Sequence, residues 1–157
     1  MVAMNSLTRR VRSERGAELI EFALVLPVLL MIVLGIVDFG FLFQRMEVVT
    51  NAAREGARIA VLPGYLEADV RARVQSYLAA GGVATTSSPA NPQVLVNMAF
   101  SIPMTAPTPA MSGKRVEVVY TYQYLFIGPF AGWFGGSFTS VPIRGVAIMR
   151  DEVATAP

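Results

Sequence analysis

The residues best placed for chemistry lie near the start of the chain, where a glycine precedes a carboxylate at the edge of an apolar run. Cleavage between Gly16 and Ala17 would free the amine of Ala17, which is positively charged near neutral pH. Glu21 would then be the fifth residue of the new chain, one helical turn from that amine. Opposite charges about 4 Å apart attract by roughly 4 kcal/mol at an effective dielectric constant of about 20. Glu21 is therefore expected to neutralise the amine of its own chain or of a neighbouring subunit.

The composition argues against catalysis. The chain has no His and no Cys, which removes the commonest general base, thiol nucleophiles and Cys/His zinc sites. Nucleotide-binding glycine motifs are absent. The acidic pair Asp151-Glu152 is more typical of a solvated tail than of a metal site. We expect no catalytic residue, no metal, no cofactor and no small-molecule substrate.

Glu21 lies at the start of an apolar stretch long enough to cross a membrane. No charged residue occurs from Phe22 to Val37, and the stretch continues to Phe43 with Asp38 as its one interruption. Spanning the hydrocarbon core takes about 20 apolar residues. A buried core helix is the alternative, but such helices are seldom apolar on every face over this length. The mean hydropathy of +0.51 for the whole chain also favours a membrane protein.

Basic residues before this stretch predict its orientation. They are Arg9, Arg10, Arg12 and Arg15. Basic residues beside a span stay on the cytoplasmic side, so the N-terminus is expected inside and residues 45–157 outside. The net charge of +2 is concentrated in this leader, because the remainder carries one more acidic than basic residue. The arginines therefore indicate topology, and no nucleic-acid partner is expected.

Three interpretations of this start compete: a cleaved secretory signal, an uncleaved anchor, and a signal that is cut before the apolar run. A secretory signal has an apolar region of about 7–15 residues and small residues at the cut. Here the apolar stretch is longer, and Phe41 to Arg45 offer no such site. Because a carboxylate in an apolar span is costly, Glu21 favours a cut that frees the Ala17 amine. The uncleaved anchor stays open.

The segment from Arg15 to Ala60 resembles a known family. RGAELIEFALVLPVLL, followed by GIVDFG and NAAREGARIA, is similar to the TadE-like family of tight-adherence (Flp) pilus assembly proteins, and GAELIEF resembles a type IV prepilin processing site. The resemblance implies a minor pseudopilin that a prepilin peptidase cuts between Gly16 and Ala17. Glu21 matches the acidic residue of the mature N-terminus and Phe22 a position that is often aromatic. Glu18 departs from the apolar residue that most type IV prepilins carry there.

The resemblance also implies a location and partners. The chain would be a single-pass protein of the bacterial inner membrane, with its N-terminus in the cytoplasm and its C-terminal domain in the periplasm. Its partners would be the peptidase, other pilin-like subunits and the pilus assembly machinery, in pilus assembly and adhesion. An uncleaved periplasmic scaffold of an envelope complex, which keeps Met1–Gly16, is the alternative. A small membrane-tethered enzyme would need an acid-only site, and no such cluster is evident.

Hydrophobic periodicity predicts an α+β fold. A continuous helix is expected over Ala17–Ala60 and a second over Glu67–Ala80, with Pro63-Gly64 between them. Alternating apolar residues predict a three-stranded antiparallel sheet, with strands at Val94–Ile102, Val116–Phe126 and Phe138–Arg150. We expect three parts: a basic cytoplasmic leader (1–16), a transmembrane helix (17–44) and a periplasmic pilin-like domain (45–157).

Two further features suggest contacts. Asp38 is expected either to reach water at the outer boundary of the span, towards Arg45, or to contact a partner subunit. The glycine-rich segment Gly128–Gly136, expected to be a loop, offers Trp133 as a second candidate subunit contact. Small residues between Ala52 and Ala60 would let another helix or a sheet approach closely, most simply the chain's own domain.

Overall fold

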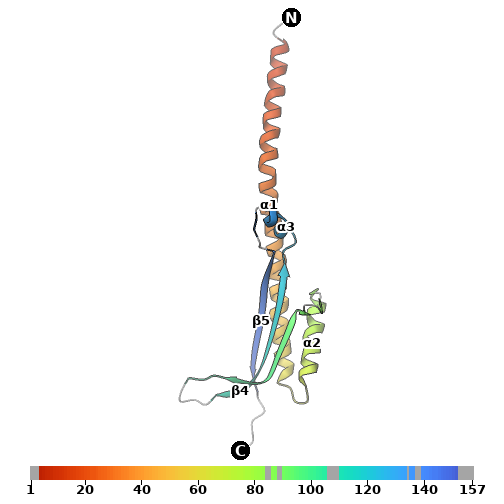
Figure 1. Ribbon diagram of the computed structural model, residues 1–157, viewed down its shortest axis with the longest axis vertical. Coiled ribbons are helices and arrows are strands. Elements are labelled where there is room, and N and C mark those ends of the chain that lie inside the picture. Colours follow the sequence, from red (N-terminus) through yellow and green to blue (C-terminus); the bar gives the residue numbers. More distant parts are fainter. Residues whose placement is uncertain are drawn as a thin grey trace, which may run out of the picture.

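The computed structural model describes residues 4–83, 86–87, 90–105, 110–133, 135–136 and 139–151. One long helix, α1 (Met4–Ala60), runs through most of the molecule, and the other elements pack along its C-terminal half (Figure 1). We call those other elements together the head. The expected helix began at Ala17, whereas α1 begins at Met4 and continues through the basic leader without a break.

The head combines a helix with a small antiparallel sheet, which confirms the predicted α+β fold. After α2 (Glu67–Ala80) come β3 (Gln93–Ile102), β4 (Met111–Gln123) and β5 (Ser140–Arg150), hydrogen-bonded in the order β3-β4-β5. The linker between α2 and β3 also holds a two-stranded hairpin of β1 (Thr86–Ser87) and β2 (Ala90–Asn91). Pro142 lies in β5, an edge strand of the sheet, where a missing N–H is tolerated.

One expectation for the head was wrong. The glycine-rich segment expected to be a loop contains a short helix, α3 (Ile127–Trp133), between β4 and β5. Gly128, Pro129 and Gly132 are weak helix formers, so local propensity gives no reason for a helix here. Its support comes from α1, as described below.

Small residues on α1 allow the head to pack closely against it, as the sequence suggested. The buried members of this surface are Ala52, Ala53, Gly56, Ala57 and Ala60. A methyl group built at Gly56 would lie 2.5 Å from a Val74 methyl of α2 and 3.1 Å from a Val116 methyl of β4. The contact that these residues make is therefore with the chain's own helix and sheet.

An ion pair also joins α1 to α2. The Glu55 carboxylate of α1 accepts a hydrogen bond from Arg73 Nη2 of α2 at 3.2 Å and another from Arg58 Nη2, within α1, at 2.9 Å. The hydrogen bond from Arg58 holds the pKa of Glu55 below its ordinary value of 4.5. Because the folded-state pKa is lowered, this contribution to stability is present at neutral pH and is lost as the pH falls below that value.

The sheet approaches α1 closely at Gly145 of β5, and this contact yields a prediction. A methyl group there would lie 2.7 Å from the Val49 carbonyl oxygen and 3.0 Å from the Thr50 Cα. Since backbone atoms cannot yield as a side chain does, Gly145→Ala should lower the free energy of unfolding by about 1–3 kcal/mol. Urea unfolding in detergent would measure it. Gly132→Ala, with nothing within 4 Å of the new methyl, is the matched control and should leave stability nearly unchanged.

Candidate functional site

The predicted processing segment lies on the part of α1 that the head leaves free. Gly16 has no neighbouring atom within 4 Å of the position of a Cβ, and the side chains of residues 17–22 are all exposed. Among them, Glu21 and Phe22 project from a helix with no tertiary cover. Both sides of the Gly16-Ala17 bond are therefore accessible to another protein.

The apolar stretch after this segment is also uncovered. Of the described residues, one helix is long and apolar enough to cross a membrane: Gly16–Ala60, with a mean hydropathy of 2.8 in its most apolar part and none of that part buried. This excludes a buried core helix. A bare apolar surface of this length requires lipid or other apolar helices around it.

The leader arginines and Trp133 are placed only in part. Arg9, Arg10, Arg12 and Arg15 lie in the first turns of α1, before Gly16, and Trp133 is the last residue of α3. Their side chains lie outside the described part of the structure. Their assignment as topology signal and subunit contact stays a prediction.

Asp38 joins α1 to the end of the head that lies nearest the bare apolar part of the helix. Its side chain is fully buried. Its Oδ1 accepts the backbone N–H of Leu125 at 3.0 Å, and its Oδ2 accepts those of Phe126 and Ile127 at 2.8 and 2.7 Å. Three backbone N–H groups at the start of α3 thus supply the hydrogen bonds that water would otherwise give the carboxylate.

The expectation that the Asp38 carboxylate reaches water is therefore wrong, because these three donors satisfy it inside the protein. Nor does it approach Arg45: the Arg45 guanidinium donates to the Gly81 carbonyl oxygen at 2.9 Å, where α2 ends. A contact of Asp38 with a partner subunit stays a prediction. The sequence does not reveal this intrachain role, because the partners lie 87 to 89 positions away.

Aromatic side chains surround this junction. The Tyr122 and Tyr124 rings pack edge to face at 5.5 Å, and Phe39 of α1 meets Tyr124 at 6.4 Å. The Tyr122 hydroxyl lies 3.5 Å from the Asp38 carbonyl oxygen. Burial, and next the Asp38 charge, raise the pKa of Tyr122 above its ordinary value of 10.0. The junction is thus a packed, largely apolar contact built around one carboxylate.

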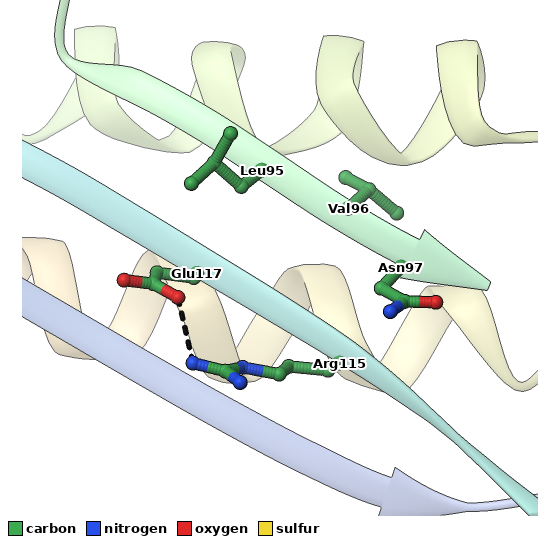
Figure 2. A pocket seen from close by; sticks show the side chains of 5 residues that line it. All are labelled: Leu95, Val96, Asn97, Arg115 and Glu117. Carbon is green, nitrogen blue, oxygen red and sulfur yellow. Dashed lines mark hydrogen bonds and ion pairs between the residues drawn. The ribbon is translucent and has the colours of Figure 1, made fainter. Parts of the chain in front are cut away.

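A small cavity on the sheet gives no support to catalysis. It has a volume of about 170 Å³ and is lined by Leu95, Val96, Asn97, Arg115 and Glu117 (Figure 2). Glu117 Oε2 accepts from Arg115 Nη2 at 2.7 Å, and its Oε1 from Arg144 Nε at 3.2 Å. The acid is therefore bound to the protein's own arginines. Within the described ranges, no group of three His, Cys, Asp or Glu residues is placed to hold a metal ion.

The chain thus combines one helix that is long and apolar enough to span a membrane with an α+β head, which is consistent with single-pass membrane anchoring. A family model described as TadE-like protein matches residues 16–58, from the predicted cleavage glycine to the small residues of α1, and so confirms the resemblance over this segment. No curated protein and no solved structure matches the chain. The TadE-like family comprises structural and assembly components of Tad pili, so the match indicates a part in Tad pilus assembly and an association with the membrane.

Proposed function

We propose that the chain is a minor pseudopilin of a tight-adherence pilus, cut by a prepilin peptidase between Gly16 and Ala17. It would lie in the bacterial inner membrane with the leader in the cytoplasm and the head in the periplasm. The proposal rests on one observation above all: the TadE-like segment begins at Gly16, directly before the part of α1 whose apolar surface the head leaves bare.

The dimensions of the bare helix support insertion after cleavage. From Ala17 to Val37 the helix rises about 31 Å, close to the hydrocarbon thickness of about 30 Å. Among the described side chains, Ile127 of α3 approaches α1 at Gly35. The proposed boundary between the transmembrane helix (17–44) and the periplasmic domain (45–157) therefore reflects the change in hydropathy along the sequence. In the structure the head also packs against the last part of the apolar stretch.

Lateral packing of these bare surfaces would provide the function. Subunits that leave the lipid must cover the same apolar surface with neighbouring helices. The Ala17 amine and the exposed Glu21 carboxylate would then meet between subunits in an environment of low dielectric constant, where their attraction is strong. Partners under this proposal are the peptidase, other pilin-like subunits and the assembly machinery.

An uncleaved scaffold protein of the envelope is the alternative, and one observation favours it. The Gly16-Ala17 bond lies within a continuous helix. Proteases act on extended backbone, so cleavage requires this turn to unwind. Gly16 eases that step, because glycine costs a helix about 1 kcal/mol relative to alanine.

The intact mass of the protein extracted from membranes tests the proposal. With the peptidase present, we expect a mass lower by that of Met1–Gly16; with the peptidase deleted, the full chain. Gly16→Val should block the loss. Gly40→Val is the matched control, since Gly40 also lies in α1 with nothing within 4 Å, and should be cut normally. A full-length chain in both strains would transfer the protein to the scaffold class.

A further inference from the structure

The end of the head nearest the bare part of α1 is formed by an uncharged segment. From Val118 to Ile143 the sequence has no Asp, Glu, Lys or Arg, and this segment includes α3, whose sequence is IGPFAGW. Figure 1 shows α3 beside α1 at the end of the head that faces the N-terminal half of that helix. Charged residues of the head are therefore absent from the segment closest to the membrane.

Two contacts fix the level of α3 along the proposed transmembrane helix. A methyl group built at Gly35 would lie 3.9 Å from Cδ1 of Ile127, and Asp38 holds the backbone N–H groups of residues 125–127. The span of about 30 Å that begins at Ala17 ends near Val37, between these two contacts. The start of α3 therefore lies at the level of the outer boundary of the hydrocarbon core.

The surface at this level is apolar and continuous with the span. Leu125 is 59% exposed beside α3, and Phe39, Phe41 and Phe43 of α1 are also exposed. The one charge at this level, Asp38, is fully buried and bonded to backbone donors, so it presents no charge to lipid. In water these large apolar side chains would be exposed at a cost in free energy, whereas lipid would cover them.

We propose that Leu125 and α3 insert into the outer interface of the bilayer, as a second membrane contact of the head. The occupant of this surface is lipid, because the surface continues that of the spanning helix. Tryptophan and other aromatic residues are enriched at such interfaces, and the segment supplies Phe126, Phe130 and Trp133 by sequence. The contact would fix the depth and rotation of the head on the membrane. This inference rests on the proposed membrane anchoring.

Site-directed spin labelling tests the inference cleanly, because the full chain has no cysteine. Three variants each carry one cysteine: at Leu125, at Ile32 within the span, or at Leu62 at the far end of the head. These side chains are 59%, 55% and 42% exposed, so a spin label fits at each position without repacking. The labelled chain is placed at low density in phosphatidylcholine/phosphatidylglycerol vesicles. Collision rates with oxygen, which enters lipid, and with a water-soluble nickel chelate are then compared.

We expect the oxygen-to-nickel ratio at Leu125→Cys to be several-fold higher than at Leu62→Cys and to approach that at Ile32→Cys. A Leu125 ratio equal to that of Leu62, with Ile32 in lipid, would overturn the second contact and leave the anchoring intact. An aqueous ratio at Ile32 would overturn the anchoring itself. If Leu125 is shielded from both reagents and becomes exposed on dilution with lipid, a second copy covers α3 and the lipid proposal is wrong.

Discussion

Asp38→Asn should lower the free energy of unfolding of the head by about 3 kcal/mol. The carboxylate accepts three backbone hydrogen bonds in a fully buried position. An asparagine at this place has one acceptor oxygen, and its NH₂ group would face an N–H donor. At least one buried N–H would then lose its partner, and the remaining bonds would lose the strength that the negative charge gives them.

Urea unfolding of the full chain in mild detergent measures this effect, with the fluorescence of Trp133, the single tryptophan, as the probe in α3. Glu67→Gln is the control, because it also neutralises a helical acid but in an exposed ion pair with Arg71. Such pairs contribute about 0–1 kcal/mol, so the control should change little. Equal midpoints for Asp38→Asn and the unmodified chain would show that the carboxylate does not hold α3 in place.

The bonds between Asp38 and the start of α3 could not be predicted from the sequence. Helix α2 and the three strands follow from local apolar periodicity, which a single sequence displays directly. Helix α3 does not, because Gly128 and Gly132 are weak helix formers and the N–H groups at its start depend on a residue in another element. An acid inside an apolar stretch signals a partner, but nothing in one sequence tells which segment supplies it.

For the candidate processing site, the sequence is more informative than the fold. Gly16, Ala17 and Glu21 were found from residue types and spacing. The fold adds only that Ala17 and Glu21 are exposed on α1 and that no atom lies within 4 Å of a Cβ built at Gly16. Their proposed role arises between molecules, since the Glu21 side chain is exposed on α1. The chemistry proposed for this segment would therefore depend on the peptidase and on adjacent subunits.

Glu21→Ala is expected to reduce the amount of assembled pilus at least tenfold while the protein still enters the membrane. Removing the carboxylate removes an attraction to the Ala17 amine that is worth roughly 4 kcal/mol at an effective dielectric constant of about 20. Losing about 1.4 kcal/mol of it already corresponds to a tenfold change in an equilibrium. Insertion should persist, because the substitution makes the start of the span more apolar.

Quantifying pili sheared from the cell surface, together with membrane fractionation, measures both effects in one strain. The control is Glu18→Ala, which removes an equally exposed carboxylate three residues earlier on the same helix and should have much the smaller effect. Intact mass must show leader removal in both variants, so that a processing defect is not mistaken for an assembly defect. Unchanged pilus output in Glu21→Ala, or an equal loss in both variants, would contradict the pairing of Glu21 with the new N-terminus.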